Sequence, residues 1–359
     1  MTSGRVLWPL LLLVAVGACT GGTDVSGKWV VDKVVPPPAP PGGETPEGPP
    51  GGGPLMDAVF DLHEDGTALT GTLGTHMFDQ PLSDGTVEGD TFSFVMKMEI
   101  GTQKMEIPFS GRAVDDKIEL TVQPPGGMPP MTLVLRRASD EEILARAGDA
   151  PEKIEPPEIQ SLPDNGLART PPMGWNSWNC FHLDISDAMI REIADAMVES
   201  GMKDAGYVYV NIDDGWQGER DDSGVLHPNE RFPDMKALAD YVHDKGLKLG
   251  IYSSPGHRTC GNQEGSYGHE EQDARMFADW GIDYIKYDWC GAFRIYENHE
   301  MQAVYQKMGA ILQALDRPIV YSLCQYGMED VWKWGPDAGG NSWRTTGDIA
   351  DNWESMEQI

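Results

Sequence analysis

Apolar and polar side chains alternate with a period of two in several short runs of the first 137 residues. Such alternation predicts a β-strand with one face buried and the other in water. Turn signals such as Asp65-Gly66 and Asp84-Gly85 separate the runs, and Asp-Gly favours tight hairpins. We therefore predict an antiparallel sandwich or barrel over residues 25–137, with strands in the runs 58–62, 91–95, 117–122 and 131–135.

A different pattern begins at Leu167, where strand-like runs alternate with amphipathic helical segments. Several of these runs are almost continuously apolar, which is typical of a buried parallel sheet. The strand candidates are 173–178, 207–214, 247–254, 282–288, 318–325 and 341–348. No glycine-rich phosphate-binding motif follows the first of them, which disfavours dinucleotide binding. Polar residues recur at the strand ends, which favours a TIM-type (β/α)8 barrel over an open doubly wound sheet.

Helices are predicted between these strands at 235–245, 270–280 and 297–315. Another is expected to start at the N-cap Ser186 and to end at Gly201. Its spacing places one apolar face against the sheet, made of Ile190, Ile193, Ala194, Met197 and Val198.

Composition marks the segments that lie between the two predicted domains or interrupt them. Residues 36–54 hold 9 Pro and 6 Gly, so we predict a loop inserted into the β domain. Residues 138–166 are charged and Pro-rich, which predicts a linker to the α/β domain at 167–359. The β domain at 25–137 resembles the small lipocalin-like domains attached to secreted bacterial enzymes.

Charge narrows the classes of partner. The chain carries 57 acidic and 27 basic residues, a formal net charge of −30. Phosphate binding needs Lys and Arg neutralisation, so the balance disfavours nucleic acid as a partner. It equally disfavours contact with an anionic membrane through a basic patch.

The first residues resemble a targeting segment rather than part of the folded domains. Arg5 precedes an apolar run at 6–16, which is too short to span a bilayer but fits the core of a signal peptide. The sequence Val16-Gly17-Ala18-Cys19 resembles a bacterial lipobox. We therefore expect a signal peptide at 1–18, a lipidated Cys19 and a tether at 19–24. The mature protein would then be held at the bacterial cell envelope, facing the periplasm or the exterior; the alternative is an ordinary secreted protein.

Candidate chemistry gathers where the predicted parallel strands end. These positions hold Trp178, Asp213, Asp214, Tyr252, Lys286, Asp288, Gln325, Arg344 and Asp348. Aromatic faces and carboxylates suit a sugar, and a glycosidase needs two carboxyl groups flanking the scissile bond. Lys286 and Asp288 are two residues apart, so both side chains leave the same face of the strand, where the cation keeps the carboxylate ionised. The alternative is that the aspartates cap the following helices.

The motifs at these positions resemble melibiase-type α-galactosidases of glycoside hydrolase family 27. They are Met173-Gly174-Trp175-Asn176-Ser177-Trp178-Asn179, Asn211-Ile212-Asp213-Asp214-Gly215-Trp216, Leu249-Gly250-Ile251-Tyr252, Lys286-Tyr287-Asp288-Trp289-Cys290 and Trp343-Arg344-Thr345-Thr346-Gly347-Asp348. The resemblance implies a retaining exo-α-galactosidase with Asp288 as nucleophile and Asp348 as general acid/base. It also implies that a galactoside is bound by Trp178, Asp213, Asp214, Tyr252, Lys286, Gln325 and Arg344. It further implies a disulfide between Cys260 and Cys290, and a reaction in which neither a cofactor nor a metal takes part.

Two departures from the family pattern leave alternatives open. Many eukaryotic members carry Cys-Glu-Trp where this chain has Cys324-Gln325-Tyr326, so α-N-acetylgalactosaminidase or β-L-arabinopyranosidase activity also fits. Residues 167–359 hold six strand candidates, whereas a complete barrel has eight strands in about 250 residues. We therefore expect a barrel truncated after its sixth strand. A non-catalytic, carbohydrate-binding surface lipoprotein is the alternative if that truncation is real.

Overall fold

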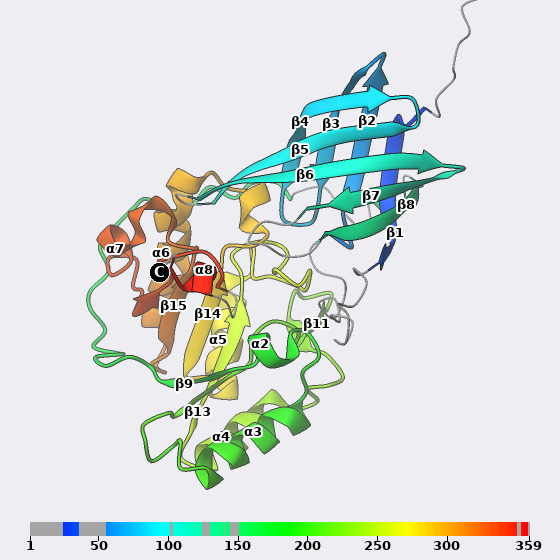
Figure 1. Ribbon diagram of the computed structural model, residues 1–359. Coiled ribbons are helices and arrows are strands. Elements are labelled where there is room, and N and C mark those ends of the chain that lie inside the picture. The colour runs from blue at the N-terminus through cyan, green and yellow to red at the C-terminus, as the bar shows by residue number, and fades with distance from the viewer. Residues whose placement is uncertain are drawn as a thin grey trace, which may run out of the picture.

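The computed structural model describes residues 24–35, 55–100, 103–123, 130–139, 141–143, 151–349 and 353–357. The predicted signal peptide at 1–18, the lipidated Cys19, the tether up to Thr23 and the Pro/Gly-rich insert at 36–54 lie outside the described residues. Two architectures follow one another along the chain, an antiparallel β-barrel and then an α/β domain (Figure 1).

The first domain is a closed barrel of eight strands in chain order. They are β1 (Gly27–Val35), β2 (Val59–Asp65), β3 (Ala68–Gly74), β4 (Asp79–Glu88), β5 (Thr91–Ile100), β6 (Gln103–Val114), β7 (Lys117–Val122) and β8 (Met131–Arg137). Antiparallel pairing of β1 with β8 closes the ring. Of the two architectures left open by the sequence, the barrel is therefore the observed one, and closure leaves no unpaired edge strand.

Aromatic side chains fill the middle of the barrel. The ring of Phe94 lies 4.7 Å from that of Phe109 and 6.4 Å from that of Phe60, measured between centroids. Phe60, Phe94 and Phe109 are each at most 2% exposed. Trp29 closes one side, where its indole N–H donates to the Val25 carbonyl at 2.8 Å and Arg137 covers the ring. The period of two in the sequence thus corresponds to one apolar face turned into the barrel.

The second domain is built on a six-stranded parallel sheet in the order β16-β15-β14-β13-β10-β9. Its strands are β9 (Gly174–Asn176), β10 (Tyr209–Asn211), β13 (Lys248–Ser253), β14 (Tyr284–Asp288), β15 (Val320–Cys324) and β16 (Ser342–Trp343). Each lies within a predicted strand run, but the hydrogen-bonded ladder is shorter than the apolar pattern. Some of the outer residues lie in buried loops next to the sheet, such as Ile212 and Ser254, whereas others, such as Met173 and Tyr207, are exposed.

Helices connect these strands and cover the sheet. The main ones are α3 (Asp187–Glu199), α4 (Met235–Asp244), α5 (Glu270–Trp280) and α6 (Met301–Gln313). Ser186 caps α3, because its side chain accepts from the Met189 N–H. Ile190, Ala194 and Met197 are buried as the spacing predicts, whereas Val198 is 38% exposed. The prediction for Val198 was wrong because this residue lies at the solvent boundary of the apolar face.

Shorter elements complete the domain. They are α2 (Trp178–Phe181), the hairpin strands β11 (Gln217–Arg220) and β12 (Leu226–Pro228), α7 (Val331–Trp334), α8 (Trp353–Met356) and the 3-10 turns Ala292–Arg294, Asn298–Glu300 and Met328–Asp330. None of the helices in the described part of the chain is long and apolar enough to cross a membrane.

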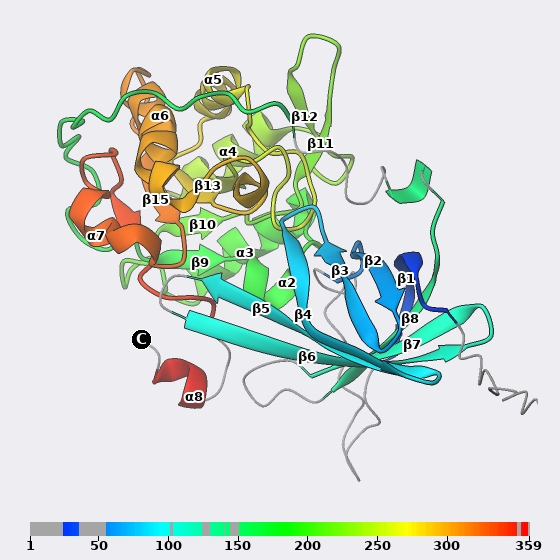
Figure 2. The same ribbon diagram turned by 90° about the horizontal axis from the view of Figure 1, so that it is seen from above.

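The described part of the predicted linker lies along the α/β domain in an extended conformation. The Leu162 N–H donates to the Asp337 carbonyl at 2.8 Å, and the Gln160 N–H donates to the Gln306 side chain at 2.7 Å. Figure 2 shows this segment crossing over α6 on its way to the first parallel strand. Residues 151–166 therefore act as a strap that is fixed by backbone hydrogen bonds.

Removing one ring from the barrel centre tests whether these aromatic contacts hold the domain together. Phe94→Ala should lower the free energy of unfolding of the barrel by about 3–5 kcal/mol, because it leaves a cavity among closely packed rings. Native-state hydrogen exchange of the β5 and β6 amides measures this domain separately from the other. Ser93→Ala, the exposed neighbour on the same strand, should change the value by less than about 0.5 kcal/mol. Equal effects of the two substitutions would contradict the proposed core.

Candidate active site

The chemical side chains of the α/β domain meet at one edge of the parallel sheet. Tyr209, Val210 and Asn211 pair in register with the first strand on one side and with β13 on the other. Tyr252 lies opposite Lys286, and Asp288 opposite Cys324. Because parallel strands end on the same side, residues just beyond these positions are brought together at the carboxyl edge. The β-barrel is stacked against this edge (Figures 1 and 2).

Asp213 accepts hydrogen bonds from several neighbouring groups at this edge. One of its oxygens accepts from the Lys286 ammonium at 2.9 Å and from the Asn176 amide at 2.8 Å. The Asp213 N–H donates to the Ser177 hydroxyl, which is itself buried. The motifs after β9 and β10 therefore interlock, and the side chain of Asp213 is fixed in position.

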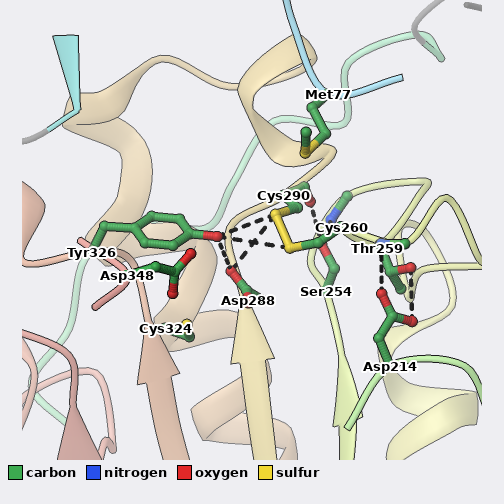
Figure 3. The surroundings of a disulfide bond; sticks show 12 residues. Met77, Asp214, Ser254, Thr259, Cys260, Asp288, Cys290, Cys324, Tyr326 and Asp348 are labelled. Carbon is green, nitrogen blue, oxygen red and sulfur yellow. Dashed lines mark hydrogen bonds between the residues drawn. A yellow bond between two sulfur atoms is a disulfide. The ribbon is translucent and has the colours of Figure 1, made fainter. Parts of the chain in front are cut away.

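Asp214 lies beside it and is fully buried. Its two oxygens accept from the Thr259 hydroxyl at 3.0 Å and from the Gly261 N–H at 2.7 Å (Figure 3). Burial raises the pKa of Asp214 to about 6, and the neighbouring charge of Asp213 adds to that rise, while the two hydrogen bonds oppose it. This carboxyl group therefore changes its charge near neutral pH.

Asp288 ends β14 and is 4% exposed. The Tyr326 hydroxyl donates to it at 2.7 Å, and the Lys286 ammonium lies 3.8 Å from its other oxygen. Burial raises the pKa of Asp288, although Lys286 and the Tyr326 hydrogen bond both act to lower it. The sequence predicted that Lys286 favours the ionised form, and the direction of its effect agrees. Burial outweighs this effect, and Lys286 lies nearer to Asp213 than to Asp288.

The predicted disulfide between Cys260 and Cys290 is confirmed. It joins the loops after β13 and β14, which approach closely at Gly291. Gly291 has φ +68°, and a Cβ there would lie 2.1 Å from the Arg258 carbonyl oxygen. The disulfide sulfurs lie next to Asp288, but because they are bonded to one another they are not thiolate ligands for a metal. Among the described cysteines, Cys180 and Cys324 are free.

Arg344 and Asp348 approach from the loop after β16. They form an ion pair at 2.8 Å, and the Arg344 guanidinium lies over the Tyr326 ring at 5.4 Å. Asp348 is largely exposed. Figure 3 shows its carboxylate beside Tyr326, on the same side of the disulfide as Asp288. The structure thus brings together one buried and one exposed carboxyl group.

The remaining predicted residues line the same region. Tyr252 is 1% exposed, donates to the Cys260 sulfur at 3.0 Å and packs its ring against the Lys286 ammonium. Gln325 is fully buried; its carbonyl accepts from the Gly327 N–H, while its amide nitrogen has no partner among the described residues. Trp178 lies half-buried at the start of α2, with its ring 5.1 Å from that of His182.

Tyr326 is a site residue that the sequence analysis did not select. Its backbone has φ +60°, a left-handed conformation that is strained for a bulky side chain. This conformation aims the hydroxyl at Asp288 and at the Cys290 sulfur, 3.2 Å away. Burial and the charge of Asp288 raise the pKa of Tyr326 well above its usual range, so the hydroxyl stays a donor. The signal in the sequence was its position directly after Gln325, at a departure from the family motif.

The arrangement offers two kinds of chemistry. Asp288 is a fixed, buried carboxylate with a cation and a hydroxyl beside it, which suits attack on an electrophilic carbon. Asp348 is exposed at the rim, which suits proton exchange with a leaving group or with water. Asp213, Asp214 and Lys286 supply acceptors and a donor at fixed positions, which is the pattern that recognises several hydroxyl groups at once.

The α/β domain is similar in sequence and in fold to known α-galactosidases. The α-galactosidase of Cyamopsis tetragonoloba is 53% identical over 202 residues, which are 55% of this chain and 48% of that protein. Among solved structures, α-galactosidase I from Mortierella vinacea superimposes with a TM-score of 0.51 at 44% identity, covering 53% of this chain and 49% of that one. The α-galactosidase from Saccharomyces cerevisiae with raffinose gives a TM-score of 0.51 at 38% identity, covering 54% of this chain and 43% of that one.

The chain spans about half the length of the curated relatives it matches. The sequence model of the melibiase family, described as alpha galactosidase A, matches residues 170–359. That match takes in every strand of the parallel sheet and more than half of the chain, so the chain belongs to the melibiase family.

Proposed function

We propose that the protein is a retaining exo-α-galactosidase that removes terminal α-galactosyl residues. The observation that carries the proposal is the buried Asp288, held between Lys286 and the Tyr326 hydroxyl next to the paired carboxylates Asp213 and Asp214. The relatives that share about half of their aligned residues with this chain are α-galactosidases. The solved structure of another similar α-galactosidase contains raffinose, a galactoside. Membership of the family supports the same activity.

We also propose that the parallel sheet is six strands of a TIM-type (β/α)8 barrel. Its strand order follows the chain from β9 to β16 without a reversal. A doubly wound sheet reverses its order at a switch point, whereas a barrel adds each strand to the same side of the one before it. In a complete barrel, further strands would lie between β16 and β9 and would supply the rest of the mouth.

The site residues then have separate tasks. Asp288 attacks the anomeric carbon while Asp348 protonates the departing oxygen, which gives a covalent glycosyl-enzyme. Asp348 next takes a proton from water, and that water displaces Asp288, so two inversions give net retention. Asp213, Asp214 and Lys286 hold the hydroxyl groups of the galactose. Arg344 reaches the C2 side, Gln325 offers its unpaired amide nitrogen, and Trp178 and Tyr252 form the walls.

Substitution of Asp288 and Asp348 tests this division of labour in the full-length product of the gene. Asp288→Ala should lower the hydrolysis of an aryl α-galactoside by ~10⁴-fold or more, because no nucleophile remains, and azide should restore turnover. Asp348→Ala should slow substrates with poor leaving groups by about 10²–10⁴-fold, while aryl substrates keep a fast first step.

Two further measurements check the result. An NMR time course should show α-galactose as the first product, and the appearance of β-galactose first would contradict retention. Asp222→Ala changes an exposed carboxylate on the β11–β12 turn and should leave the rates unchanged. Faster hydrolysis of an aryl α-N-acetylgalactosaminide or β-L-arabinopyranoside than of the galactoside would reassign the substrate.

Asp214 should make sugar binding depend on pH. Its pKa of about 6 means that the carboxylate is present above that pH and protonated below it. Because a protonated oxygen no longer accepts from a sugar hydroxyl, affinity for galactose should fall as the pH decreases through about 6. Titration calorimetry of galactose at several pH values measures this. Asp214→Asn should remove the dependence, Asp222→Asn should keep it, and a flat profile in the parent protein would count against the role of Asp214.

We further propose that the mature protein is lipid-anchored through Cys19 at the bacterial cell envelope. The support is the apolar run at 6–16, followed by Val-Gly-Ala directly before that cysteine. Cys19→Ala should move the protein from the membrane fraction to the soluble fraction after cell fractionation. Mass spectrometry of the mature N-terminus completes the experiment. A soluble parent protein that begins at another residue would show that the segment is an ordinary secretory signal.

A further inference from the structure

The turn between β3 and β4 is the part of the barrel that reaches the active-site edge. It comprises residues 75–78 and is rigid, because the Thr75 N–H donates to the Phe78 carbonyl at 2.8 Å. The Thr75 hydroxyl also accepts from the N–H groups of Met77 and Phe78. Thr75 itself is fully buried. A turn bonded in this way holds its side chains in one orientation.

The side chains of His76 and Asp79 form polar contacts with the α/β domain. His76 is 4% exposed; one ring nitrogen lies 3.1 Å from the Cys260 carbonyl oxygen, and the other contacts the carboxylate of Asp57 within the barrel. Asp79, at the start of β4, pairs with Arg294 at 3.3 Å. His76 therefore contacts the backbone of the disulfide loop, whereas Asp79 contacts a more distant turn.

His76 contacts the loop at Cys260, and the residues on both sides of Cys260 donate hydrogen bonds to Asp214, the carboxylate proposed to bind the sugar. Thr259 and Gly261, the two chain neighbours of Cys260, are the groups that donate to Asp214. Cys260 is also bonded to Cys290, two residues after Asp288. Figure 3 shows Met77, from the same turn as His76, lying over this disulfide. One carbonyl group thus connects the barrel to the loop that orients Asp214.

We propose that His76, although it belongs to the N-terminal barrel, is a positioning residue of the active site. By fixing the Cys260 carbonyl, it holds Thr259 and Gly261 where they orient Asp214 for sugar binding. The inference rests on the proposed function for its consequence in catalysis, but the position of the loop can be measured without it. The alternative is that His76 only holds one domain against the other and does not affect the position of the loop.

Asp79 provides the matched control, because it also links the two domains but pairs with Arg294 rather than with the Cys260 carbonyl. In the full-length product of the gene, His76→Ala should raise KM for an aryl α-galactoside and Kd for galactose about fivefold, with kcat changed less than about twofold. That split is expected because Asp214 binds the sugar in the ground state and in the transition state alike. His76→Gln keeps an N–H donor and should recover most of the affinity. Asp79→Ala should leave both constants near the parent values.

Hydrogen exchange of the Gly261 and Gln263 amides measures the loop directly, since both are hydrogen-bonded within this region. His76→Ala should speed their exchange, and Asp79→Ala should not. The proposal is overturned if His76→Ala leaves the exchange rates unchanged, if Asp79→Ala has the same effects, or if kcat falls while KM stays constant. If the parent protein neither hydrolyses α-galactosides nor binds galactose, the proposed function fails. The exchange rates then still decide whether His76 positions the loop.

Discussion

The site depends on one partly buried cation, Lys286, which lies among three buried carboxyl groups. Lys286 lies 2.9 Å from Asp213 and 3.8 Å from Asp288, and Asp214 is next to Asp213 in the chain. A single positive charge cannot compensate three negative ones, and an unpaired buried charge is costly. The pKa values of Asp214 and Asp288 are accordingly raised, with burial as the main cause. Lys286 offsets burial only in part, so each of these carboxyl groups also depends on neighbouring hydrogen-bond donors.

Neighbouring residues supply these donors. Thr259 and Gly261 donate to Asp214, and the Tyr326 hydroxyl donates to Asp288. All three lie in loops, which need external support to keep such positions. The Cys260–Cys290 disulfide gives that support without adding charge beside Asp288. The β3–β4 turn of the barrel packs on the same loop, so the arrangement of the carboxyl edge depends on both domains.

The sequence predicted the parts of the molecule that follow from local periodicity. Alternation predicted a barrel or a sandwich, and apolar runs with helices between them predicted the parallel sheet. Both predictions were possible because each pattern indicates which faces are buried. Site residues such as Asp213 and Asp288 could be predicted because parallel strands end at a common edge. Tyr326 and His76 could not be predicted as residues of this region. The role of Tyr326 depends on its left-handed backbone, and that of His76 depends on the docking of a distant turn. Periodicity carries no information about either.

Asp288 and Asp348 differ in their burial and in their charged partners. Burial raises the pKa of Asp288, while Asp348 lies exposed and paired with Arg344. Lys286 acts to lower the pKa of Asp288, but it lies nearer to Asp213, at 2.9 Å against 3.8 Å. In the proposed function, a galactose whose hydroxyl groups donate to Asp213 and Asp214 would satisfy those two carboxylates and leave Lys286 to stabilise the charged form of Asp288.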